Sequence, residues 1–152
     1  LYNPWLCTTK HYAAFSDSAL EFNDIDVAKN IDYIIGASML LTKPLLEKAG
    51  LLCEDYFLYY EEIDLALRSK GIFSLGVASK SIVYHKEGAS MDGGRSMLSD
   101  YYAVRNKIII TRKFYNKLSF VIKLSFILLI INRLRRFEFK KALKNLSALL
   151  IK

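Results

Sequence analysis

A run of aromatic residues that passes directly into a cluster of carboxylates is the feature that most constrains how this chain can fold. Phe57-Leu58-Tyr59-Tyr60 is followed by Glu61, Glu62 and Asp64, at what reads as the start of a short helix. Apolar surroundings and neighbouring like charges both raise the pKa of a carboxyl group. Carboxylates in such a setting are candidates for a general base or a metal ligand. The alternative is an ordinary helix N-terminus, where acidic side chains interact favourably with the helix dipole.

Caps, stop signals and periodicity predict several helices. They are expected over Lys43–Ala49, over Glu62–Lys70, from Ser99 or Asp100 to about Tyr115, over Leu118–Ile131, and in a basic tail beyond Arg133. Short apolar runs predict buried strands over Ile31–Ile35, Ile72–Val77 and Ser81–His85. The segment Lys86–Ser96 is rich in glycine, serine and charge, and we expect a mobile loop over a site there.

Charge is distributed unevenly along the chain. Residues 1–104 hold 9 Lys+Arg and 14 Asp+Glu, whereas residues 105–152 hold 13 Lys+Arg and one acid, Glu138. A strongly basic segment favours anionic lipid or nucleic acid as a partner. In this tail the cations are interleaved with long aliphatic side chains, and few aromatic residues are present to stack on bases. We therefore expect a membrane surface as the partner and no nucleic acid.

The tail, residues 116–152, has the pattern of basic amphipathic helices. Leu118–Ile131 is almost wholly apolar, and as a helix it would be about 21 Å long, which is short of the about 30 Å core of a bilayer. An interfacial or core helix is therefore expected in place of a membrane span. Beyond it, leucines at helical spacing form a stripe that Lys140, Lys141 and Lys144 largely avoid. The alternative is a terminal helix packed on another part of the protein.

A single domain is the prior for 152 residues. Cys7 and Cys53 lack the spacing of a metal site, and we expect buried free thiols. We expect no secretory signal within the first residues of this sequence.

The order of motifs along the chain resembles the C-terminal half of a family 2 glycosyltransferase of the bacterial rhamnosyltransferase-like type. The segments that carry the resemblance are Asp32–Leu41, Leu45–Leu52, Phe57–Arg68, Val83–Ser90 and Tyr101–Asn106. The resemblance implies the α/β class and a partial GT-A fold, a mixed sheet with flanking helices. Residues 1–115 would be the acceptor-side half of the catalytic domain. The nucleotide-binding half of the family, with its Asp-x-Asp motif, has no counterpart in this sequence, and we expect a fragment of a larger enzyme.

The resemblance also implies roles for the carboxylates. The usual Glu-Asp-x-Asp pattern is Glu61-Glu62-Ile63-Asp64 in this sequence, so Glu62 stands where the family has Asp and is the expected catalytic base. Its carboxyl group extends one methylene further, and displacements of about 1 Å matter in a reacting geometry. Glu61 and Asp64 are expected to support the catalytic site, with Asp64 orienting Arg68 or a backbone amide.

Other positions match the substrate and metal sites of the family. Gly36, Ala37 and Ser38 correspond to a small-residue segment near the donor sugar, with a plain turn as the alternative. Arg105 is expected to contact phosphate or hold the glycine-rich loop, with a structural ion pair as the alternative. His85 matches a histidine that helps to bind a divalent metal, Mg or Mn, or the diphosphate. A structural histidine is the alternative at that position.

The implied activity is inverting transfer of a sugar from a nucleotide-diphosphate sugar to a glycan or lipid-linked acceptor. The expected setting is bacterial surface polysaccharide synthesis at the cytoplasmic face of the cell membrane, as a peripheral protein. We expect the chain alone to be inactive. The alternative is a truncated, non-catalytic module that binds a membrane surface or a protein partner.

Overall fold

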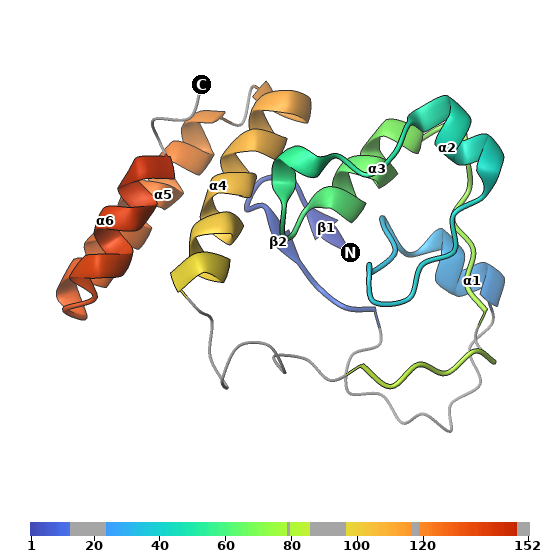
Figure 1. Cartoon of the computed structure of the whole chain (residues 1–152), viewed down its shortest axis with the longest axis horizontal. Coiled ribbons are helices and arrows are strands. Elements are labelled where there is room, and N and C mark those ends of the chain that lie inside the picture. Colours follow the sequence, from blue (N-terminus) through green and yellow to red (C-terminus); the bar gives the residue numbers. More distant parts are fainter. Residues whose placement is uncertain (13–23, 79, 86–96, 117–118, 149–152) are drawn as a thin grey trace. The chain divides into compact units, whose positions relative to one another are not determined.

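The computed structural model describes residues 1–12, 24–78, 80–85, 97–116 and 119–148. In chain order, the elements are β1 (Tyr2–Asn3), β2 (Thr8–Thr9), α1 (Asp24–Lys29), α2 (Lys43–Ala49), the 3-10 turn η1 (Glu54–Tyr56), α3 (Glu61–Ser69), α4 (Met97–Phe114), α5 (Ser119–Arg135) and α6 (Phe139–Ser147) (Figure 1). None of the described helices is long and apolar enough to cross a membrane.

The chain forms two compact units. Unit 1 comprises Leu1–Asn3, Thr8–Cys53 and Glu61–His85. Unit 2 comprises Pro4–Cys7, Glu54–Tyr60 and Lys86–Lys152. The long helix α4 therefore belongs with the basic tail, whereas the domain boundary predicted from the sequence lies after it, at residue 115. The pairwise packing of α4, α5 and α6 accounts for this grouping.

Unit 1 contains short elements joined by loops. Strands β1 and β2 pair antiparallel, with Tyr2 opposite Thr9. Helix α2 has the predicted bounds, begins after Thr42 and is followed by Gly50 with a φ of 81°. A positive φ is the usual conformation of a glycine that ends a helix. Helix α3 confirms the predicted helix and begins one residue earlier, at Glu61, with Ile63 and Leu65 buried.

The predicted strands are absent from the described residues. Ile31–Ile35, Ile72–Val77 and Ser81–His85 belong to loops, so these three predictions are wrong. Apolar character makes a segment suitable for a sheet, but a strand forms only when its backbone groups pair with a second strand. The described residues offer these segments no such neighbour. The apolar side chains of Ser81–His85 are correspondingly exposed, Tyr84 by 95% and Ile82 by 70%, whereas several of those in the other two segments are half-buried.

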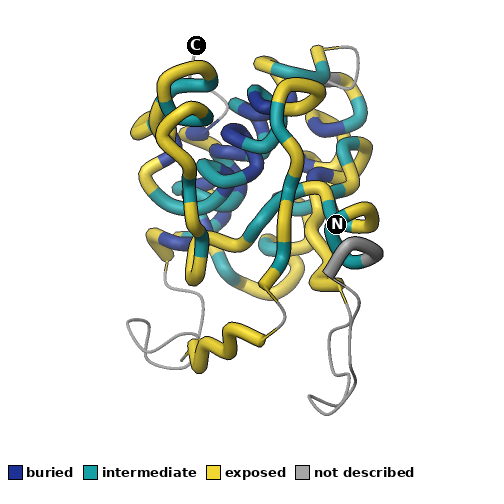
Figure 2. The backbone as a smooth tube through the Cα atoms, turned by 90° about the vertical axis from the view of Figure 1, so that its right-hand side faces the viewer, coloured by how far each residue is buried: buried dark blue, intermediate teal, exposed yellow. Residues whose placement is uncertain are grey.

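Unit 2 is a helical unit with its own core. Helices α4, α5 and α6 enclose a cluster formed by Val104, Ile108, Phe126, Ile130 and Ala148. Figure 2 shows buried and exposed residues alternating along the helices, as expected when one side of each helix packs on its neighbours. Helices α4 and α5 confirm two of the predicted helices. The thiol of Cys7 is buried, as predicted, and lies 3.0 Å from the Thr111 hydroxyl, whereas Cys53 is half-buried; the two form no disulfide.

A buried polar cluster joins the three helices of unit 2. The Asp100 carboxylate, on α4, forms an ion pair with Arg133 of α5 and accepts a hydrogen bond of 2.9 Å from the Asn145 side chain of α6. Arg133 also donates to Glu138 at 2.8 Å. Asp100 and Asn145 are almost fully buried. The sequence predicted Asp100 as a possible helix cap, but α4 begins at Met97 and Asp100 instead binds the neighbouring helices.

Candidate functional site

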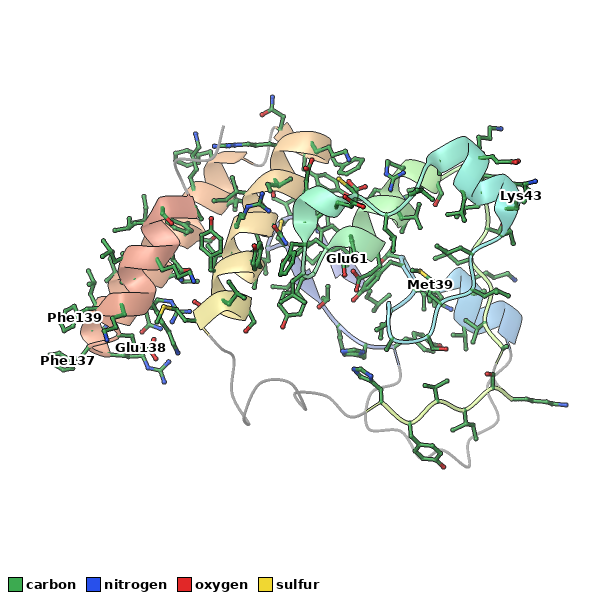
Figure 3. All side chains as sticks on the ribbon, in the orientation of Figure 1. Met39, Lys43, Glu61, Phe137, Glu138 and Phe139 are labelled. Atoms are coloured by element: carbon green, nitrogen blue, oxygen red, sulfur yellow. The ribbon has the colours of Figure 1, made fainter. Side chains whose placement is uncertain are left out.

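Glu61 and Glu62 lie in the first turn of α3, and Figure 3 shows Glu61 at that position. Both side chains are half-buried. The Oε2 atom of each is buried and has no hydrogen-bond partner among the described residues. A buried polar atom without a partner costs free energy, so such atoms call for a missing ligand or water. The pair of carboxylates is therefore the candidate site.

The surroundings of Glu62 favour its neutral form. Burial raises the pKa of Glu62 above its ordinary value of 4.5, and the nearby charge of Glu61 raises it further. Hydrogen bonds from the backbone N–H groups of Glu62 and Gly36 act in the opposite direction and limit the rise. A carboxylate with a raised pKa is a stronger base, which is the property needed to take a proton from a hydroxyl group near neutral pH.

Gly36 is the predicted substrate residue that the structure brings to the candidate site. It lies with Ala37 and Ser38 in an exposed turn, closed by a 3.3 Å hydrogen bond from the Ser38 N–H to the Ile35 carbonyl. A Cβ atom built on Gly36 would meet no atom within 4 Å. The space beside Gly36 is thus open.

Tyr33 is a neighbour of Glu62 that the sequence analysis did not assign. Burial raises the pKa of Tyr33, a hydrogen bond with the Thr9 side chain opposes the rise, and the charges of Glu62 and Asp32 add to it. Asp32 itself accepts a 2.9 Å hydrogen bond from the Tyr2 N–H. Tyr33 and Asp32 lie about thirty positions before Glu62 in the chain, so no local spacing signal could place Tyr33 beside it.

Asp64 stabilises the position of α3 through its ion pair with Arg68. Its side chain is fully buried, and its Oδ2 atom accepts a 2.7 Å hydrogen bond from Arg68 Nε. The same guanidinium donates to the Leu51 carbonyl at 2.8 Å and to the Ala49 carbonyl at the end of α2. Asp64 is therefore occupied by Arg68, which is the orienting contact expected from the sequence, and Arg68 joins α3 to the C-terminus of α2.

The residues that immediately precede Glu61 adopt a strained backbone. Phe57, Tyr59 and Tyr60 have φ values of 60°, 69° and 77°. This left-handed region costs about 1–3 kcal/mol for each residue that carries a side chain. Asn106, fully buried on α4, donates from Nδ2 to the carbonyls of Tyr56, Leu58 and Tyr59 at 2.8, 2.7 and 3.0 Å. Asn106 is thus the residue that holds this turn, a role that its sequence context did not indicate.

Arg105 lies in unit 2 and makes local contacts. Its guanidinium donates to the Asp55 carbonyl at 2.5 Å and to the Asn106 side chain at 2.9 Å, and it lies 5.8 Å from the centre of the Tyr102 ring. The described contacts of Arg105 are structural, as the alternative from sequence allowed. The predicted contact with phosphate stays a prediction.

The described residues do not form a complete metal site. His85 is exposed in a loop, and no group of three or more potential ligands gathers in the described parts of the chain. The two unpartnered oxygens of Glu61 and Glu62 are of the kind that Mg²⁺ prefers, but two carboxylates are too few to hold the ion without further ligands. The predicted loop Lys86–Ser96 lies outside the described residues.

A separate shallow groove is present in unit 1. It has a volume of about 600 Å³ and is lined by Ala28, Lys29, Ile31 and Ser74–Val77. None of the predicted site residues lines it. It is open and mostly apolar, and Lys29 is the one titratable residue among those that line it, so it lacks the pair of convergent acid and base groups expected of a catalytic site.

Comparisons with known proteins give one distant relative. The low-salt glycan biosynthesis hexosyltransferase Agl10 of Haloferax volcanii is 24% identical over 90 residues. The matched region covers 59% of this chain but only 29% of that protein. No protein-family profile matches the chain, and no solved structure matches it. The chain is therefore distantly similar to a hexosyltransferase over a limited part of that protein's length.

Proposed function

We propose that this chain is the acceptor-side part of a family 2 glycosyltransferase with the GT-A fold. The observation that carries the proposal is the half-buried pair of Glu61 and Glu62, each with a buried oxygen that lacks a partner among the described residues. The distant similarity to a hexosyltransferase supports the same class of reaction. The order of motifs between Asp32 and Asn106 supports family 2.

Glu62 acts in this proposal as the general base. Its carboxylate accepts the proton of an acceptor hydroxyl while that oxygen forms a bond to the anomeric carbon of the donor sugar. The bond from the anomeric carbon to the nucleoside diphosphate breaks on the opposite face, so the configuration inverts. The raised pKa of Glu62 suits it to accept this proton near neutral pH.

Glu61 and Gly36 support Glu62 in different ways. The charge of Glu61 raises the pKa of Glu62, and a hydrogen bond from the Gly36 backbone limits that rise. The open space beside Gly36 is where the donor sugar or the acceptor would lie. A divalent cation, Mg²⁺ or Mn²⁺, would balance the diphosphate charge. The described residues do not supply a full set of ligands for this cation.

The remaining parts of the proposal are the substrates and the location. The donor is a nucleotide-diphosphate sugar, and the acceptor is a glycan or a lipid-linked saccharide of a bacterial surface polysaccharide. The reaction takes place at the cytoplasmic face of the membrane. In this proposal the nucleotide of the donor is bound by the nucleotide-binding half of the enzyme, so the active protein is a polypeptide that contains both this chain and that half.

The test is sugar transfer by that polypeptide with Glu62→Gln. A panel of radiolabelled UDP-, GDP- and dTDP-sugars identifies the donor, and a membrane extract supplies the acceptor. Glutamine keeps the shape of the side chain and still accepts the Gly36 hydrogen bond, but it cannot take a proton. We expect kcat to fall by about 10²–10⁴-fold, the usual contribution of a general base, with donor binding changed less than about twofold.

Glu54→Gln is the matched control, because Glu54 is an exposed glutamate outside the candidate site. It should transfer sugar at the rate of the unmodified protein. Retention of transfer by Glu62→Gln would exclude Glu62 as the base. Loss of donor binding in that variant would place Glu62 in donor or metal binding instead.

A further inference from the structure

Helix α5 has two apolar faces. Ile122, Phe126 and Ile130 are buried within unit 2. The opposite side carries large apolar residues at helical spacing that are exposed: Phe120, Leu124, Ile127, Leu128, Ile131 and Leu134. Phe120 is exposed by 75%. The packing of the helical unit therefore uses one face of α5 and leaves the other without a described partner. Contiguous exposed apolar surface marks interaction sites.

The turn after α5 and helix α6 continue this exposed apolar surface along the chain. Phe137 is exposed by 80%, and Leu143 on α6 by 72%. The rings of Phe137 and Phe139 contact each other edge to face, with centroids 6.1 Å apart. Figure 3 shows both phenylalanines pointing away from the helices of unit 2. The apolar residues of α5 named above, with Phe137, Phe139, Leu143 and Leu146, are called the apolar face below.

Cations accompany the apolar face. Lys123, Arg135, Arg136 and Lys140 are exposed on the same two helices and the turn between them. The one acid in residues 105–152, Glu138, is bound by Arg133 and lies 3.6 Å from the Lys141 ammonium. Its charge is thereby compensated. The exposed charge around the apolar face is positive.

We infer that the apolar face docks into the headgroup region of a bilayer that contains anionic phospholipid. Exposed apolar side chains bordered by Lys and Arg are the arrangement of helices that lie in the plane of a membrane interface. Each Lys or Arg near an anionic surface adds about 1 kcal/mol of attraction. A second copy of the chain is the weaker candidate, because it would bring two sets of uncompensated cations together. This inference does not depend on the proposed catalysis.

The experiment measures binding of the 152-residue chain to sedimented vesicles. One set contains phosphatidylcholine alone, and the other contains 30% phosphatidylglycerol, a fraction chosen to give roughly the surface charge of an anionic leaflet. We expect binding to the anionic vesicles at least about tenfold tighter than to the neutral ones, weakening as salt is raised because the Debye length shortens. Sedimentation requires no donor, acceptor or activity, so its failure is separate from failure of the proposed function.

The double variant Phe137→Ser/Leu143→Ser tests the surface itself. Both side chains are highly exposed, so the fold should be kept, and circular dichroism checks this. We expect vesicle binding to fall at least about tenfold, since large apolar side chains drive insertion at an interface. The matched control is Leu40→Ser/Leu51→Ser, at residues of unit 1 that are exposed by 91% and 73%. The control should bind vesicles as the unmodified chain does.

Three outcomes overturn the inference. Equal binding to neutral and anionic vesicles would remove the role of the cations. An equal decrease of vesicle binding in the Leu40→Ser/Leu51→Ser variant would show that non-specific hydrophobic adsorption causes the sedimentation. The unmodified chain could also fail to bind vesicles and form dimers instead. If the double variant Phe137→Ser/Leu143→Ser were then monomeric, the apolar face would be the interface with a second copy of the chain.

Discussion

Asn106 should be among the most sensitive positions in the chain. Its amide donates to three carbonyls of the turn before Glu61, and that turn contains three aromatic residues with left-handed backbone. The replacement Asn106→Ala removes these hydrogen bonds, although the Tyr56 carbonyl keeps a 2.7 Å hydrogen bond from the Leu58 N–H. Each hydrogen bond contributes about 1 kcal/mol net, so the three together contribute about 3 kcal/mol. The expected loss in free energy of unfolding is about 3 kcal/mol.

The aspartate variant sharpens this prediction. In Asn106→Asp an ionised carboxylate would face the three carbonyl oxygens with no proton to donate. The decrease in free energy of unfolding at pH 7 should therefore be larger for Asn106→Asp than for Asn106→Ala. Urea unfolding followed by circular dichroism measures both variants. A thermal melt should show a decrease of about 6–12 °C for Asn106→Ala, from about 2–4 °C per kcal/mol in a chain of this size.

Asn132→Ala is the matched control for Asn106. Asn132 lies on α5 with an exposed side chain, so its replacement should change stability by less than about 0.5 kcal/mol. The reasoning is refuted if Asn106→Ala loses less than about 1 kcal/mol, or if the aspartate variant at pH 7 is no worse than the alanine variant.

Two further predictions concern unit 1. Because the folded chain raises the pKa of Glu62, it binds this proton more tightly than the unfolded chain, so ionisation of Glu62 destabilises the fold as pH rises from 4.5 through the raised pKa. In urea titrations, Glu62→Gln should therefore be more stable than the unmodified chain at pH 7.5, and this difference should disappear near pH 4.5. The same difference in free energy of unfolding at both pH values would contradict the assigned cause. Arg68→Met leaves the Asp64 carboxylate fully buried without its ion pair, and about 3 kcal/mol of stability should be lost. Lys70→Met, at an exposed lysine, is the control in thermal melts. The double variant Arg68→Met/Asp64→Asn should be more stable than Arg68→Met alone, because it no longer buries an unpaired carboxylate.

The sequence predicted the helices better than it predicted the rest of the fold. Helix α2 has the predicted bounds because Pro44 and Gly50 act locally at its two ends. Ile72–Val77 and Ser81–His85 have the composition of strands, but composition does not provide a pairing neighbour, and the described residues contain none. The partial GT-A fold therefore stays a prediction.

The candidate site was predictable in its chemistry but only partly in its geometry. Glu61 and Glu62 were identified because carboxylates directly after aromatics are unusual. The contact between Gly36 and Glu62 and the approach of Tyr33 arise from segments far apart in the chain. Asn106 was noted only as part of the segment Tyr101–Asn106 that carries the family resemblance. Its role as a turn support was not predicted, because an asparagine inside a helix is identified as a turn support only when the turn beside it is known.

The Asp100 cluster has a consequence for how the helices of unit 2 select one alignment. Aliphatic side chains such as Val104 and Ile130 would still meet others of their kind if α5 slid by one turn along α4. The ion pair of Asp100 with Arg133 and its hydrogen bond with Asn145 would break in such a slide. A buried carboxylate stripped of these contacts is strongly unfavourable. The polar cluster thus specifies the register of α5 along α4. It disfavours alignments shifted by one helical turn, which the apolar core alone would tolerate.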